Sequence, residues 1–276
     1  MGLLFRYTIL LGTLLQVVSA AHVTQNLWSL YYTIKQTGYC RNTLKGGFAT
    51  IEGQGPDYVY CGDHLKSEGI VYIQGVNGNL AALGPSCAGD TYRYNDDFDS
   101  YCDSSLDNPV NPTTFQPIIQ SYNVGVSDFN PYVTSFVTFG NVESKNPGFI
   151  SFDPRKYGIE PMSIIAVVCN NRMFYGIWGN MNKDDGPPLV GEASGSIAKL
   201  CFGSYFDYYY SSNHTDILYI AFTGKDAVVG PHGAKWNATT IREFQDSIEA
   251  QGNRLIEKRI KCWSPVYCQL SKVPAH

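Results

Sequence analysis

Three carboxylic acids and an amide lie within one short stretch of the chain. Asn180, Asp184, Asp185 and Glu192 fall within thirteen positions, in the segment FYGIWGNMNKDD…VGEAS. Two carboxyl groups held across a bound sugar are what glycoside hydrolysis requires, because one protonates the leaving oxygen while the other activates water. The sequence therefore predicts a loop bounded by glycines that carries these groups between an aromatic strand and a helix of small residues.

The elements that must hold this loop follow from the pattern of apolar residues. A helix is predicted over 24–35, where apolar residues recur on one face, and a closing helix begins at Thr240 with Glu243 completing a capping box. The pair Asn170–Asn171 favours a hairpin turn between two strands. The predicted strands cover 69–75, 133–139, 162–169, 173–178 and 217–222. The fold is thus predicted to be mainly β.

Size and the N-terminal segment set the domain organisation. Residues 1–20 combine Arg6 with an apolar run too short to span a bilayer and end in Val18-Ser19-Ala20, which predicts a cleaved signal peptide. The remaining 21–276 are enough for one domain, and no linker divides them. We expect an exported protein without a membrane span.

Charge argues against nucleic acid as a partner. The net charge of the chain is −4, and several bases crowd its end, so the body is more acidic than the total. Nucleic acid requires a basic surface, whereas an acidic cleft concentrates a cationic ligand. Neither phosphate-binding loops nor the spacing of a nucleophile elbow occurs, and we expect no cofactor.

Eight cysteines in an exported chain indicate four disulfides, for which the sequence alone leaves about 105 pairings. We expect neighbours to pair. No C-x-x-C is present and the five histidines are scattered, so a metal site is not expected. The expected pairs are Cys40–Cys61, Cys87–Cys102, Cys169–Cys201 and Cys262–Cys268.

Two further features bear on the surface. Residues 90–107 gather six aspartates and three tyrosines, which fits a solvated loop, a wall that attracts amino sugars or, less well, a calcium loop without EF-hand spacing. The triplets beginning at Asn213 and Asn237 are acceptor sequences for N-glycans.

Several segments together resemble the fungal-type chitosanases, glycoside hydrolase family 75. The stretch 178–184 resembles W-G-D-x-N-G-D, and 191–198 resembles G-E-A-S-x-S-L-A. Residues 152–161 are similar to F-D-P-x-x-Y-G-x-x-P, and 130–133 with 139–141 to H-P-Y-V-V-F-G-N. Residues 218–228, 46–48 and 60–63 also match, in the family's order, so the resemblance spans roughly residues 24–255.

The resemblance implies a secreted, inverting endo-chitosanase, acting as a monomer on β-1,4 links between glucosamine residues of chitosan. Glu192 aligns with the family's proton donor, and a distorted, double-psi-like barrel of about six strands with flanking helices is expected by analogy. Trp178, Tyr175 and Ser194 are the expected substrate contacts.

The sequence differs from the family pattern at two places, and these differences leave two hypotheses open: an enzyme or a binding protein. Asn180 stands where the family has the aspartate that takes a proton from water, and an amide is not a comparable base. Asp184 and Asp185 are candidates to compensate. Residues 83–89 read LGPSCAG where the family reads M-D-I-D-C-D-G, so three acids are missing. The alternative to an enzyme is therefore a binding homologue that recognises the oligosaccharide with weak or no activity.

Overall fold

A computed structural model describes residues 23–50, 55, 57–90, 111–142, 149–183, 188–203 and 215–262. The predicted signal peptide, most of the aspartate-rich segment, Asp184, Asp185 and the acceptor at Asn213 lie outside these residues. Within the described part, no helix has the length and apolar content needed to cross a membrane.

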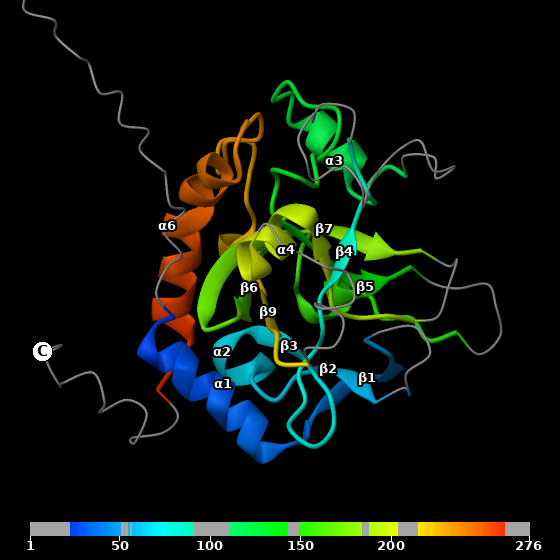
Figure 1. Cartoon of the computed structure of the whole chain (residues 1–276), viewed down its shortest axis with the longest axis vertical. Coiled ribbons are helices and arrows are strands. Elements are labelled where there is room, and N and C mark those ends of the chain that lie inside the picture. The colour runs from blue at the N-terminus through cyan, green and yellow to red at the C-terminus, as the bar shows by residue number, and fades with distance from the viewer. Residues whose placement is uncertain are drawn as a thin grey trace, which may run out of the picture.

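The described strands form one strongly curved sheet (Figure 1). Its strand order is β1-β2-β3-β9-β6-β7-β5-β8-β4. Most neighbours are antiparallel, but β5–β7 and β4–β8 are parallel. The strands are β1 (Thr43–Phe48), β2 (Tyr58–Cys61), β3 (Ile70–Gln74), β4 (Gly84–Ser86), β5 (Phe136–Asn141), β6 (Ile164–Cys169), β7 (Arg172–Asn182), β8 (Glu192–Ser194) and β9 (Leu218–Phe222).

Curvature brings the first strand back to the residues that lead into β8. The Ala49 N–H donates to Pro188 O at 3.0 Å, and the Val190 N–H donates to Ala49 O at 2.9 Å. The sheet is thus a curled half-barrel around an apolar interior. The mainly β class is confirmed, whereas the expectation of about six strands is corrected to nine within the described residues. The double-psi connectivity stays a prediction.

The predicted hairpin at Asn170–Asn171 is present between β6 and β7. Both asparagines have positive φ, 46° and 57°, as a two-residue turn of this hand requires. All six residues of β6 are buried. A strand buried on both faces needs cover on each side, and helices supply part of it.

The longest helix, α6 (Ile241–Arg259), covers β6 and β7 on the left of Figure 1. It begins at the predicted cap, where Thr240 Oγ1 accepts the Glu243 N–H at 3.2 Å. Buried Gln245 accepts the Tyr175 N–H at 3.2 Å and donates to Tyr175 O at 2.6 Å, which satisfies backbone groups of β7. The other helices among the described residues are α1 (Gln25–Thr37), α2 (Leu65–Glu68), α3 (Gln116–Ser121), α4 (Gly195–Phe202) and the 3₁₀ turns η1 (Pro154–Tyr157) and η2 (Lys225–Ala227).

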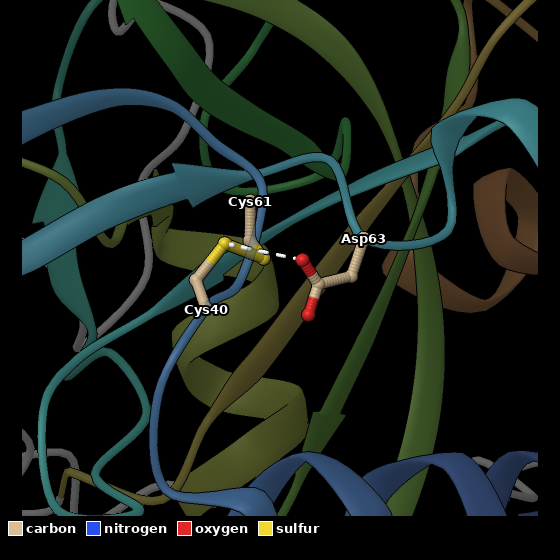
Figure 2. Close-up of side chains that lie close together, drawn as sticks. All are labelled: Cys40, Cys61 and Asp63. Atoms are coloured by element: carbon tan, nitrogen blue, oxygen red, sulfur yellow. Dashed lines mark hydrogen bonds between the residues drawn. A yellow bond between two sulfur atoms is a disulfide. The ribbon is translucent and has the colours of Figure 1, made fainter.

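Two of the expected disulfides, Cys40–Cys61 and Cys169–Cys201, are confirmed. Cys87 and Cys262 are also disulfide-bonded, and their expected partners, Cys102 and Cys268, lie outside the described residues. Figure 2 shows Asp63 beside the first bridge, with its Oδ1 3.7 Å from Cys40 Sγ. The three residues could hold a metal by distance. Oxidised sulfurs are not thiolate ligands, so this group serves as structure and not as a metal site.

Candidate active site

Three neighbouring strands bring Asn180, Thr138 and Glu192 into one row across the sheet. Thr138 of β5 pairs with Asn180 of β7. On the other side of β5, Val137 pairs with Ala193 of β8 in antiparallel register. Because the strands are antiparallel, Thr138, which follows Val137, lies opposite Glu192, which precedes Ala193. Residues that lie opposite each other on neighbouring strands point to the same face of the sheet.

The spacing of this row suits a sugar between its ends. Neighbouring strands lie about 4.8 Å apart, so the backbones at Asn180 and Glu192 are separated by roughly 10 Å. Carboxyl groups of inverting glycosidases are about 6.5–9.5 Å apart, which leaves room for a water molecule. The backbone separation of the row is of the same order as that spacing.

A bulge at Gly179 decides which way Asn180 faces. Val137 pairs with Trp178, but the next residue, Thr138, pairs with Asn180, so Gly179 is skipped in the register. An extra residue of this kind reverses the alternation and re-aims the side chain that follows. A Cβ on Gly179 would lie 2.6 Å from Phe136 Cβ, so no larger residue fits here without displacing β5.

The Asn180 amide is 8% exposed and held firmly. Its Oδ1 accepts the Thr114 N–H at 2.9 Å and the Thr114 hydroxyl at 3.0 Å. Its Nδ2 lies 3.5 Å from Thr138 Oγ1, to which it donates. Because Oδ1 already has two donors, the group that Asn180 turns toward the row is its NH₂, which cannot take a proton from water.

Thr114 is itself held by the preceding residue. The Thr113 N–H and hydroxyl both donate to the buried Asp128 carboxylate, at 2.9 and 2.5 Å. Burial raises the pKa of Asp128, although these hydrogen bonds oppose the shift. Asp128 and Asn180 are therefore bound by consecutive threonines, which fixes the segment that enters α3.

Glu192 is partly exposed at the start of β8, three residues before α4 begins, so it belongs to a strand and not to the first turn of the helix. Its parallel neighbour on β4 is Gly84, where a Cβ would lie 3.7 Å from Glu192 Cγ. Burial raises the pKa of the Tyr60 and Tyr219 phenols. The charge of Glu192 raises both pKa values further. The hydrogen bond that the Gly140 N–H donates to the Tyr60 hydroxyl lowers the pKa of Tyr60 and so opposes its shift.

These two tyrosines fix the backbone on either side of the row. Tyr219 donates to Gly191 O at 3.0 Å, directly before Glu192, and Tyr60 accepts the Gly140 N–H at 2.8 Å, two residues after Thr138. Both side chains are essentially buried. They act as supports for the strands that carry the row.

The side chains expected to contact substrate are in the interior. Trp178 is 0% exposed and donates its indole N–H to Asn180 O at 3.0 Å. Tyr175 is 1% exposed, against α6. Ser194 is fully buried, where its Oγ accepts the Phe136 N–H. In this structure all three hold the strands of the site and offer no surface to a sugar.

The structure adds residues that sequence reasoning missed. Thr114, Thr138 and Gly84 lie beside Asn180 or Glu192 but are 42 or more positions from either in the chain. Asp184 and Asp185 lie outside the described residues. A weak signal for Gly84 existed, because it stands in the segment where three acids of the resembled family are missing.

The row on β7, β5 and β8 therefore coincides with the segments that carry the sequence resemblance. Residues 86–258 match the family described as fungal chitosanase of glycosyl hydrolase group 75. The chain belongs to this family. Its members are glycoside hydrolases, and Glu192 is the partly exposed carboxyl group of the row.

Relatives in this family are similar over nearly their whole length. An endo-chitosanase of Aspergillus oryzae is 34% identical over 241 residues, which cover 86% of this chain and 92% of the relative. An endo-chitosanase of Aspergillus fumigatus is 33% identical over 252 residues, covering 90% and 96%. An endo-chitosanase B of Aspergillus oryzae is 34% identical over 250 residues, also covering 90% and 96%.

Other segments shared with the group 75 chitosanases build the frame of the site. Asn141 binds the 150–152 segment through both ends of its amide, to Ile150 O and from the Phe152 N–H. Asp153 caps η1 by accepting the Arg155 N–H at 3.0 Å. The similarity in these segments therefore concerns the scaffold more than the chemistry.

Proposed function

We propose that this protein is a secreted endo-chitosanase that hydrolyses β-1,4 links between glucosamine residues with inversion. Glu192 is the proton donor to the leaving oxygen. The supporting relatives carry the name endo-chitosanase and match almost the full length of the chain. Chitosan is cationic, and the acidic balance of the chain favours its approach.

The observation that carries the proposal is the Asn180–Thr138–Glu192 row. It presents a partly exposed carboxyl group on a rigid strand, at a separation from position 180 that leaves room for water. Glu192 donates its proton to the glycosidic oxygen, and a water molecule on the side of Asn180 attacks the anomeric carbon. Asp184 or Asp185 takes the proton from that water, less effectively than the aspartate that the family has at position 180 would.

A second candidate function rests on the state of Asn180. Its amide presents a donor toward the row, and general-base catalysis is worth about 10² to 10⁴-fold, so without another base the protein would bind chitosan and cleave it slowly at best. In that case the protein is an oligosaccharide-binding homologue.

Viscosity of a chitosan solution separates the two candidates. An endo-acting enzyme lowers viscosity early, because internal cuts shorten the polymer. The purified protein is compared with Glu192→Gln and with a matched control, Glu257→Gln, which lies exposed on α6. The proposal predicts a fall in viscosity for the protein and the control, and none for Glu192→Gln. No fall with the unmodified protein at high concentration, together with retained binding to chitosan beads, would establish the binding homologue instead.

Secretion is part of the proposal and is tested separately. Residues 1–20 are the proposed signal, and the confirmed disulfides suit an oxidising compartment. The glycan acceptor at Asn237 is exposed, as is Thr239 of its triplet. Expression from the full coding sequence should give culture medium containing a protein that begins at Ala21, and cell-retained protein beginning at Met1 would refute this part.

A further inference from the structure

A cavity of about 400 Å³ lies apart from the row of the candidate active site. None of its lining residues belongs to β5, β7, β8 or β4. It is bounded by α1, β3 and the loops on either side of the Cys40–Cys61 disulfide, and its volume falls in the range of small-ligand sites, about 300–1,000 Å³. The lining residues are Thr33, Ile34, Thr37, Tyr39, Arg41, Asn42, Asp63, His64, Tyr72 and Gln74.

The wall formed by residues 39–42 is rigid. The disulfide ties Cys40 to β2, and Asp63 accepts the backbone N–H groups of Arg41 at 3.0 Å and Asn42 at 2.6 Å (Figure 2 shows the carboxylate next to the bridge). The Asn42 side chain also donates to Gly62 O at 2.8 Å. A binding wall held in this way loses little conformational entropy when a ligand arrives.

The floor holds a polar group whose hydrogen-bonding capacity is only half used. Gln74 is 1% exposed, and its Nε2 donates to Ile34 O at 3.2 Å. Its Oε1 accepts no hydrogen bond from the residues that the structure describes. Buried acceptors are normally paired, so an unpaired one against a cavity points to a donor supplied from outside the chain.

The chemistry of the lining is that of hydroxyl recognition. Most of the side chains are neutral alcohols, amides or phenols, and the charges of Arg41 and Asp63 balance each other. Burial is the main cause of the raised pKa of the Tyr72 phenol, and Asp63 adds to the shift while Arg41 opposes it, so these three groups lie close together. Tyr39 at the rim is 58% exposed and offers an aromatic face.

From these features we propose that the cavity binds one or two units of a neutral saccharide, at a site distinct from Glu192. Aromatic rings stack on the apolar faces of sugars, and amide and hydroxyl side chains exchange hydrogen bonds with their edges. A free anion finds a single guanidinium here, because His64 already binds Glu68 at 2.9 Å. A free cation finds only Asp63, whose oxygens already accept backbone N–H groups.

Binding is measured by NMR titration of the full mature protein carrying Glu192→Gln, so that turnover plays no part and failure of the enzymatic proposal leaves the test intact. The probes are diacetylchitobiose, the glucosamine dimer and cellobiose. Saturable shifts at Tyr39, His64 and Gln74 are expected with diacetylchitobiose and cellobiose, and weaker shifts with the charged dimer because of Arg41. Shifts confined to β7 and β8 would place all binding in the active site and overturn the inference.

Two variants test the named groups. Tyr39→Ala should weaken binding about fivefold or more, as loss of an aromatic stacking contact implies, while the exposed control Phe149→Ala leaves it unchanged. Gln74→Met keeps the volume but removes the unpaired acceptor together with the Nε2 donor to Ile34 O, so affinity should fall. Because Tyr39 is exposed, its variant remains informative even if the Gln74 variant fails to fold. Equal affinity in Tyr39→Ala and the parent protein would overturn the inference.

Discussion

Thr114 donates two hydrogen bonds to a single oxygen of Asn180, one from its backbone N–H at 2.9 Å and one from its hydroxyl at 3.0 Å. Two donors directed at one oxygen form a site that would suit a carboxylate at least as well as an amide. The position would therefore accommodate an aspartate, although the sequence places an asparagine there.

Asn180→Asp should raise the rate of chitosan hydrolysis. The Thr114 donors would stabilise the ionised carboxylate and leave its second oxygen facing the row, where it can accept a proton from water. We expect a gain on the order of 10² to 10⁴-fold, the usual worth of a general base, measured as kcat/KM on a chitosan oligomer.

The matched control is Asn182→Asp, the same change two residues along β7. Asn182 donates to Leu189 O at 3.0 Å and is not part of the row, so its variant should show no gain. An unchanged rate in Asn180→Asp would show that position 180 does not face the attacking water, and its assigned role would have to be withdrawn.

Gly84→Asp should shift the pH dependence of the reaction. The backbone at Gly84 has room for a side chain, because only Glu192 Cγ lies near the added Cβ, at 3.7 Å. A second negative charge beside Glu192 disfavours its ionised form and raises its pKa. A proton donor loses its proton, and with it the activity, as pH rises above its pKa. A higher pKa of Glu192 therefore moves the alkaline limb of the kcat/KM profile to higher pH.

This profile is best recorded in the more active Asn180→Asp protein, with Gly84→Asn as the control of equal size. The uncharged control should leave the limb in place. An identical alkaline limb in both variants would show that Glu192 is not the group that titrates there.

Gly252→Ala should destabilise the protein. Gly252 lies where α6 crosses β7, and an added Cβ would come within 2.5 Å of the Tyr175 ring. Overpacking of this kind costs about 1–3 kcal/mol, although alanine is otherwise the better helix former. Urea unfolding measures the loss. Gly230→Ala, which has open space around its Cβ, should change the free energy of unfolding by no more than about 0.5 kcal/mol.

Acid should weaken the protein partly through Glu243. The hydrogen bond from Lys235 lowers the pKa of Glu243 to about 2, helped by the Thr239 N–H. A lowered carboxyl pKa gives stability that is present above the unfolded value, near 4.5, and is lost as pH falls toward 2. Glu243→Gln should therefore lose less stability between pH 5 and 2.5 than the parent protein.

Denaturant midpoints across this range provide the measurement. Glu257→Gln, also on α6, is the control and should follow the parent curve. Parallel curves for all three proteins would mean that the Lys235–Glu243 pair contributes nothing to acid sensitivity.

Local patterns predicted the elements but not the site. The helices, the hairpin at Asn170–Asn171 and the core strands follow from periodicity, caps and turn residues that act over a few positions. The Asn180–Thr138–Glu192 row depends on strand register and on a one-residue bulge at Gly179, which no local pattern encodes. Thr114 binds Asn180 across 66 positions for the same reason.

The aromatic side chains predicted to contact substrate are buried and have a structural role. An aromatic residue next to a candidate site suggests sugar stacking, yet Trp178 and Tyr175 are both buried and support the strands. The strand count was underestimated because β2, β4 and β8 are only three or four residues long and β1 contains two glycines, so these strands carry little apolar signal.

The ends of the segment between β7 and β8 are anchored independently of what lies between them. Asn182 holds Leu189, and Ala49 holds both Pro188 and Val190. Residues between these anchors can be replaced, lengthened or shortened without changing the register of the sheet. Exchange of this one insert would therefore leave Glu192 at its place on β8.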